Sequence, residues 1–327
     1  MNIRDNTYVI KALLSSGVIL NLSNAVDGQF QWGEQKGELA QRLMVTFANA
    51  NTPYGSLKAV LALCTRFYVY ANGEEVFRGV EWDIDSKSSD KRTVPIIAYD
   101  KSKYLMESQD QSYYPAGYST KSIVSDICNR WGIPLNYTWS SWTHPKTLFR
   151  GSESLADQIT QTIETAQKHL STKPVVIMDK DTLSVRPKGS NSEIYKLRQY
   201  ENLTGAENHA SMDGLVTRVR ILGKEDNDGR SGIAATVNGK TEYGILQKVI
   251  YQDGDKTLAD AKAEANELLS EKGAPTREML MVSADVPKMR KGDKVNAIAD
   301  VLNGYYYVAG ITHDAITRTM SLEVEAL

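Results

Sequence analysis

The sequence predicts a mainly β fold in which two antiparallel β-barrel domains flank a small α+β insertion. Apolar and polar residues alternate near both ends of the 327-residue chain, as in residues 43–47 and 320–325, while the middle repeats its apolar residues with helical spacing. A short motif also occurs once in each β-rich half. We therefore expect an N-terminal β-barrel over residues 1–105, an α+β domain over 106–200, and a C-terminal β-barrel with one inserted helix over 201–327.

The repeated motif pairs residues 72–83 with residues 303–314. Each copy begins with Asn-Gly, which favours the positive φ angles of a type I′ hairpin turn, and carries a later glycine suited to a bulge or a close backbone approach. Two unrelated hairpins with the same turn chemistry are the alternative. The shared positions are Asn72, Gly73, Phe77, Gly79, Val80 and Asp83 in one copy and Asn303, Gly304, Val308, Gly310, Ile311 and Asp314 in the other.

The first two domains contain the following elements in order. The N-terminal third predicts strands at residues 43–47, 67–70, 80–85 and 93–99. In the middle, the apolar residues between Ile123 and Trp131 form one helical face, with Thr120 as N-cap and Gly132 as C-cap. Ser154 and Asp157 form a capping box for a second helix, and a hairpin follows at 175–185.

The C-terminal third returns to strands. It predicts a strand at 215–222, a helix capped by Thr257 and Asp260, and strands at 279–284, 294–299, 305–313 and 320–326. The polar, glycine-rich segment 223–240 is either an arm that reaches a neighbouring subunit or a surface hairpin.

Charge and cysteine content exclude several classes of protein. A formal net charge of −2 argues against a dedicated nucleic-acid binder, although DNA could pass by such a protein without specific binding. Cys64 and Cys128 are the two cysteines, and their separation predicts two structural thiols rather than a disulfide framework. No apolar run reaches the length of a membrane span, so we expect no membrane insertion.

The search for a reactive site predicts no catalytic, cofactor-binding or metal-binding residue. The histidines at 144, 169, 209 and 313 lack the spacing of a zinc-protease helix, and His313 is expected at a strand end on the surface. Asp226-Asn-Asp228-Gly229 lacks the glutamate that would complete a calcium loop, which favours a hairpin tip. The acidic residues are expected mostly on solvated strand faces, although a carboxylate pair brought together in space stays open.

Several segments, taken together, resemble the baseplate hub proteins of contractile phage tails. The family is the late control protein D type, in its short XkdQ/YqbQ-like form from defective prophages. The segments that carry the resemblance are Ser119-Thr-Lys-Ser-Ile-Val-Ser-Asp-Ile-Cys-Asn-Arg-Trp-Gly132-Ile-Pro134, Glu153-Ser-Leu-Ala-Asp-Gln-Ile159, the 175–185 hairpin, Lys291-Gly-Asp-Lys-Val295, Tyr306-Tyr-Val-Ala-Gly-Ile311 and Thr319-Met-Ser-Leu-Glu-Val324.

The resemblance implies a homotrimer whose subunits each carry two tube-like β-barrels. Three copies would then present six similar barrels in a ring and adapt a sixfold tail tube to a threefold central spike. The implied partners are the tail tube protein, the central spike protein, and baseplate wedge or LysM-type tail proteins, with DNA passing through the lumen. The implied location is the baseplate of a virion or tail-like particle, after synthesis in the bacterial cytoplasm.

Two other functions are left open at this point. One is a tail-associated cell-wall (peptidoglycan) hydrolase. The other is a carbohydrate-binding adhesion module that would use Trp139, Trp142, Tyr113, Tyr114 and the tyrosines at 305–307 as stacking surfaces. Whether the particle is an infectious phage, a defective prophage or bacteriocin-like is also open.

Overall fold

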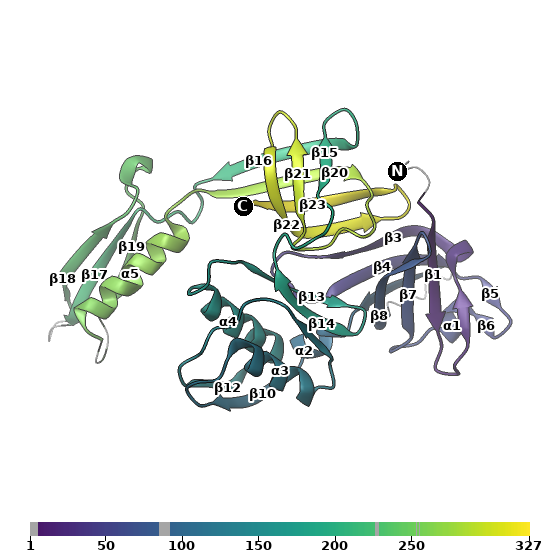
Figure 1. Cartoon of the computed structure of the whole chain (residues 1–327), viewed down its shortest axis with the longest axis horizontal. Helices are drawn as coiled ribbons and strands as arrows, with labels where there is room; N and C mark the ends of the chain where they lie inside the picture. Colours follow the sequence, from purple (N-terminus) through teal and green to yellow (C-terminus); the bar gives the residue numbers. More distant parts are fainter. Residues whose placement is uncertain (1–5, 85–91, 226–228, 253, 255) are drawn as a thin grey trace. The chain divides into compact units, whose positions relative to one another are not determined.

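The computed structural model describes residues 6–84, 92–225, 229–252, 254 and 256–327 (Figure 1). The chain divides into two compact units: residues 208–278 form one, and residues 1–207 together with 279–327 form the other. Most regular structure is β-strand, and a helical segment interrupts the strands of the larger unit. The predicted mainly β fold class is therefore confirmed, while the domain boundaries at 105 and 200 stay a prediction.

The larger unit holds two β-regions separated by a helical region. The N-terminal β-region contains β1 (Tyr8–Leu13), β2 (Ile19–Asn21), η2 (Ser23–Ala25), β3 (Val26–Glu34), β4 (Gln41–Ala48), β5 (Asn51–Thr52), β6 (Gly55–Ser56), α1 (Leu57–Val60), β7 (Arg66–Ala71), β8 (Glu74–Ile84) and β9 (Thr93–Tyr99). The C-terminal β-region contains β15 (Tyr195–Arg198), β16 (Leu203–Ser211), β20 (Thr276–Ala284), β21 (Lys294–Ile298), β22 (Asn303–Asp314) and β23 (Thr319–Ala326).

Strands of both β-regions pair into one 13-stranded sheet. Its order is β16-β20-β23-β22-β3-β4-β9-β8-β7-β1-β2, with β21 attached to β22 and β15 to β21. The same five-strand order thus occurs twice: β3-β4-β9-β8-β7 in the first β-region and β16-β20-β23-β22-β21 in the second. In the described chain, no strand pair closes either set into a ring. Figure 1 shows β22 and β3 adjacent where the two sets meet.

Each β-region has its own apolar core on one face of the shared sheet. The N-terminal core includes Ile10, Phe30, Leu43, Val45, Phe47, Phe67, Val69, Phe77, Val94 and Ile96. The C-terminal core includes Leu197, Met279, Met281, Val295, Val308, Ile311, Met320, Leu322 and Val324. The predicted alternations at 43–47 and 320–325 are confirmed, because the apolar member of each pair is buried.

The two motif copies use their Asn-Gly pairs differently. Asn72 and Gly73 have φ angles of 52° and 84° and form the predicted tight turn between β7 and β8. The second prediction is wrong: Asn303 and Gly304 begin β22, and the turn lies before them at residues 299–302. The reason is packing, because Leu302 is buried and holds the longer turn against the core.

The second glycine of each motif copy lies where another chain segment passes closely. A Cβ atom at Gly79 would lie 2.4 Å from the carbonyl oxygen of Tyr99, and one at Gly310 would lie 3.0 Å from the backbone nitrogen of Lys36. Gly79 therefore has no room for a side chain, and a Cβ atom at Gly310 would crowd the neighbouring backbone, in line with the close approach that the motif predicted.

The middle region confirms most of its predicted elements. It contains α2 (Ser102–Met106), β10 (Gln109–Tyr114), α3 (Thr120–Arg130), β11 (Leu135–Tyr137), β12 (Thr147–Ser154), α4 (Leu155–Gln167), β13 (Pro174–Asp179) and β14 (Thr182–Pro187). Ser154 and Asp157 form the predicted capping box of α4. The cap of α3 was misassigned: Ser119, with extended backbone, accepts the N–H of Ser122, while the Thr120 side chain bonds to Trp142 and His144.

The smaller unit is a three-stranded sheet with one helix on its face. Strands β17 (Arg218–Glu225), β18 (Ser231–Asn238) and β19 (Gln247–Tyr251) pair in the order β18-β17-β19, η3 is Thr241–Tyr243, and α5 is Leu258–Lys272. Thr257 and Asp260 cap α5 as predicted. Val219 and Ile221 of β17 pack against Ala261 and Ala265 of α5. Segment 223–240 thus contributes β18, an edge strand paired with β17.

Candidate functional site

The most distinctive feature of the larger unit is the joint between its two β-regions. Residues 311–314 of β22 pair antiparallel with residues 31–34 of β3, almost 300 positions away in the sequence. The other half of β22 uses the same edge to pair with β21, and its opposite edge pairs with β23. The long strand β22 therefore pairs with three strands, β21, β23 and β3, and joins the strands of both β-regions in one sheet.

A buried polar cluster lies beneath this joint. The His313 ring stacks on the Trp32 ring at 5.0 Å, its Nδ1 lies 2.6 Å from Asp285 Oδ1, and its Nε2 lies 3.1 Å from the Met289 carbonyl oxygen. The Tyr8 hydroxyl donates to the other Asp285 oxygen at 2.6 Å. The expectation of a surface His313 is therefore wrong: a bulge at Ala309 brings Ile311 and His313 onto the buried face.

A second buried cluster connects both β-regions to the middle region. Arg290, in the loop between β20 and β21, donates to both carboxylate oxygens of Glu34 at 2.7 and 3.1 Å and to the Met178 carbonyl oxygen of β13 at 2.8 Å. Lys291 N–H donates to Glu34 as well, at 2.8 Å. Burial disfavours the charged form of Glu34, but the charges of Arg290 and Lys291 outweigh it and hold the pKa below its usual value.

Gly292 allows the loop that carries Arg290 to lie against the middle region. Its φ angle is +85°, and a Cβ atom there would lie 2.5 Å from Cγ1 of Val175 in β13. Next to it, Asp293 accepts a hydrogen bond from Arg186 of β14 at 2.8 Å. The Lys291-Gly-Asp-Lys-Val295 segment is thus a junction of three regions.

We expect Gly292→Ala to lower the free energy of unfolding by about 2–3 kcal/mol, because it adds steric overlap to an unfavourable positive φ. Gly117→Ala is the matched control, since Gly117 has φ +102° but no atom within 4 Å of an added Cβ. Urea denaturation followed by tryptophan fluorescence measures both variants. Equal losses in the two variants would contradict the assigned packing role of Gly292.

The histidines of the middle region make hydrogen-bond and stacking contacts. His144 bonds to Thr120, and Trp142 stacks on His169 at 4.2 Å inside the middle region. Within the described ranges, no group of three or more histidine, cysteine or acidic side chains could hold a metal ion. The calcium-like segment lies partly outside the described residues, since only Gly229 of its four residues is described.

Two further expectations are corrected by the burial of individual side chains. Cys128 is buried and burial raises its thiol pKa to about 12, as expected of a structural thiol, but Cys64 is exposed. The acidic residues are not confined to solvated faces, because several carboxylates are almost completely buried: Glu34, Glu81, Asp100, Asp285 and Asp293.

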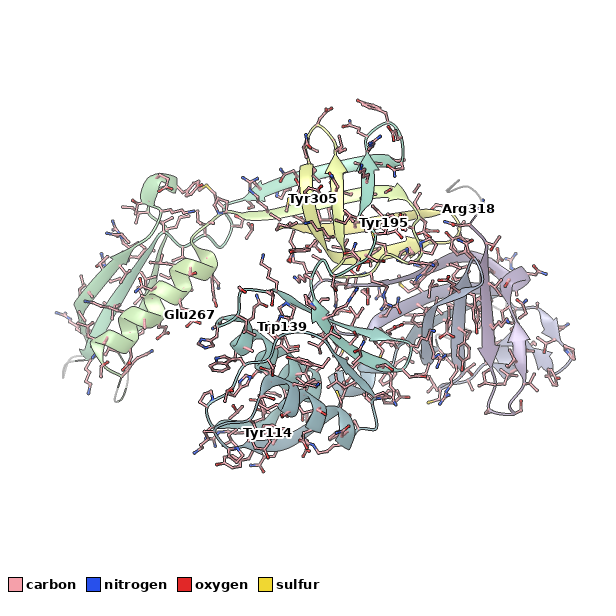
Figure 2. The ribbon with its side chains drawn as sticks, viewed as in Figure 1. Tyr114, Trp139, Tyr195, Glu267, Tyr305 and Arg318 are labelled. Atoms are coloured by element: carbon pink, nitrogen blue, oxygen red, sulfur yellow. The ribbon has the colours of Figure 1, made fainter. Side chains whose placement is uncertain are left out.

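The aromatic residues of the carbohydrate hypothesis do not form one exposed platform. Trp139 is buried in the middle region and donates its Nε1–H to the Thr172 backbone at 3.0 Å, and Tyr114 is also buried. Tyr305, which is labelled in Figure 2, is half exposed and belongs to β22. The Lys294 ammonium group lies over its ring. Of the described helices, none has the length and apolarity needed to cross a membrane.

Sequence reasoning missed the residues that form the joint. Glu34 is about 250 positions from Asp285 and Arg290, His313 comes from a later strand, and no motif quoted from the sequence contains more than one of the four. A partial signal was present, since the segment that resembles the hub proteins at 291–295 immediately follows Arg290.

Comparison with known proteins identifies the family. The YQBQ-like family model matches residues 30–325. The chain belongs to the YQBQ-like family. Among its relatives, it is 25% identical to the phage-like element PBSX protein XkdQ of Bacillus subtilis (strain 168), over 67% of each chain. It is also 22% identical to the uncharacterized protein YqbQ of the same organism, over 77% of this chain and 78% of the relative.

A solved structure shares the fold of this YQBQ-like chain. The 43 kDa tail protein of prophage MuSo2 from Shewanella oneidensis aligns with a TM-score of 0.68 at 14% identity, over 98% of both chains. The family and this fold confirm the resemblance to phage baseplate-type proteins that the sequence motifs suggested.

Proposed function

We propose that this YQBQ-like protein is the structural hub of the baseplate of a contractile phage tail or tail-like particle. Three copies form a ring that joins the sixfold tail tube to the threefold central spike. Membership of the YQBQ-like family and the relationship to a protein of the phage-like element PBSX support a tail role. The trimeric adaptor role is the finer part of the proposal.

The repeated five-strand order is the observation that carries the adaptor role. One chain supplies two sheets with the same connectivity, so three chains supply six similar modules around a threefold axis. A ring of this kind satisfies sixfold contacts on one side and threefold contacts on the other. The buried ion pair and the pairing of β3 with β22 support the proposal, because they fix the two modules of a chain relative to each other.

The proposed partners are further copies of this chain, the tail tube protein, the central spike protein, and baseplate wedge or LysM-type tail proteins. DNA passes through the lumen of the ring without specific binding, in keeping with the slightly acidic chain. The protein acts in the assembled particle and has no catalytic step. Neither the hydrolase nor the carbohydrate-binding alternative gains a specific observation from the described residues.

The solution mass of the purified chain tests this function. We expect light scattering after size-exclusion chromatography to give three times the 36.3 kDa chain mass for the chain alone, and the same three chains plus the mass of the bound spike protein when that partner is added. Electron microscopy of the complex with the tail tube protein should then show one ring at the end of each tube. A chain that stays monomeric with both partners present would contradict the proposal.

A further inference from the structure

The edge strand β16 has an edge that is available for pairing with another strand. Its described strand partner is β20, and apart from an isolated bridge between Leu203 and Gln199, no other part of the described chain pairs with it. Over nine residues it contains no proline or lysine, and its one acidic residue is Glu207. Soluble proteins normally protect long edges with such residues, with bulges or with a covering segment, because open edges pair with other chains.

The internal repeat indicates what covers this edge. β3 is the first strand of the first set and lies next to β4. β16 is the first strand of the second set and lies next to β20, so it corresponds to β3. The free edge of β3 is covered within the chain by the C-terminal half of β22. β8 corresponds in the first set to β22 in the second. β8 lies between β7 and β9 in the sheet, and β22 lies between β21 and β23.

The C-terminal part of β8, which corresponds to the half of β22 that pairs with β3, has one edge without a described strand partner. Its pairing with β7 ends at Val80, and the backbone of Glu81 is bonded to Cys64 and Thr65. Beyond this point, residues 82–84 pair with β9 on one edge and with no described strand on the other. β22 shows the same division, with β21 on the first half of one edge and β3 on the second.

We propose that residues 203–207 of β16 pair with residues 82–84 of β8 from a second copy of this chain. The contact repeats between chains the pairing of β22 with β3 within a chain. Because its two surfaces differ, the contact is heterologous, and a threefold rotation closes it into a ring in which residues 203–207 no longer present an open edge. The inference rests on the proposed trimeric hub and identifies the subunit interface of that ring.

The outer face beside β16 is also uncovered. Leu280 and Val282 of β20 are each 38% exposed, and together with Gly205 and Glu207 they line a groove of about 270 Å³. A strand added at β16 would extend the sheet next to this groove and reduce the exposure of its apolar residues.

Disulfide cross-linking tests the assigned edges. Cysteines replace Asp83 of β8 and, one at a time, each of Thr204, Gly205, Ala206 and Glu207 of β16, all in a Cys64→Ser chain; Cys128 is kept because it is buried. Strand pairing places at least one of these positions within disulfide range of Asp83→Cys. We expect mild oxidation to link most chains covalently into dimers and trimers on non-reducing gels, with the native circular dichroism spectrum retained.

The controls separate this inference from the proposed function. Glu264→Cys on α5, combined with Asp83→Cys, gives the background of random collisions, and each single cysteine variant should stay unlinked. If the Cys64→Ser chain has the mass of a trimer but no β16 position cross-links above this background, the assigned edges are wrong and the hub function stands. If the chain is monomeric with both tail partners present, both proposals are overturned.

Discussion

Replacing Arg290 with methionine is expected to lower the free energy of unfolding by about 3–5 kcal/mol, the usual cost of leaving a buried charge without its partner. The Arg290 side chain is 16% exposed and that of Glu34 only 1%. Without the guanidinium, Glu34 keeps only the backbone N–H of Lys291 as a hydrogen-bond donor, and the Met178 carbonyl oxygen loses its charged donor. Urea denaturation of the full chain at pH 7 measures the loss.

The double variant Arg290→Met with Glu34→Gln tests whether the loss comes from an unpaired charge. Because glutamine is neutral, the double variant should recover part of the stability that Arg290→Met loses. Arg198→Met is the surface control, since Arg198 and Glu201 form an exposed pair at 3.3 Å, and a change below about 1 kcal/mol is expected. A loss in Arg290→Met as small as in this control would show that the cluster does not hold the three regions together.

Elements specified by neighbouring residues could be predicted from the sequence. The capping boxes of α4 and α5 depend on residues three positions apart, and the Asn72-Gly73 turn depends on two adjacent ones. The buried face of α3 follows from the spacing of its apolar residues. For these elements, local conformational preference and tertiary packing favour the same structure.

The errors arise where distant packing decides the local structure. Asn303-Gly304 has the same preference as Asn72-Gly73, but the burial of Leu302 moves the turn ahead of it. His313 is buried because one extra residue in β22 changes which side chains face the core, and its acceptors are at positions 285 and 289. The pairing of β3 with β22 has no local signal in the sequence, and the ion pair of Glu34 with Arg290 has only an indirect one, the hub-like segment at 291–295 that follows Arg290.

The joint gives a physical reason for the strand repeat. If the two strand sets of one chain moved independently, three chains would present six modules with no fixed spacing. The β3–β22 pairing and the two buried polar clusters remove this freedom inside each chain. An interface that repeats the same strand pairing between chains would then give all six modules similar neighbours.

Glu81 is expected to make the protein less stable as the pH rises from about 4.5 to about 8. Its side chain is buried in the N-terminal β-region, and among the described residues neither carboxylate oxygen has a partner in hydrogen-bond geometry, so burial raises the pKa more than the nearby Thr65 hydroxyl lowers it. Burial raises its pKa to about 8, so the folded protein holds a proton that the unfolded chain releases near pH 4.5. The stability that this proton contributes is complete below pH 4.5, decreases up to about pH 8 and does not change further above it.

The size of this effect is on the order of 5 kcal/mol across that range, at 1.36 kcal/mol for each pKa unit. Asp100 adds a change of the same sign, because burial raises its pKa to about 7. The hydrogen bonds that it accepts from the backbone N–H groups of Gln41 and Ser102 lower the pKa, but by less than burial raises it. The lowered pKa of buried His144 adds a change of opposite sign near pH 6.5. Urea denaturation at several pH values between 4.5 and 9 should therefore show a net decrease in the free energy of unfolding.

Glu81→Gln isolates the contribution of Glu81, because glutamine keeps the shape of the side chain but does not titrate. We expect this variant to lose much less stability than the wild type between pH 5 and pH 8.5, with a remaining slope from Asp100. Asp83→Asn, an exposed change two residues along β8, should leave the wild-type slope unchanged. If Glu81→Gln and the wild type showed the same pH slope, the buried carboxyl would have to be ionised and paired in the folded protein, contrary to its environment in this structure.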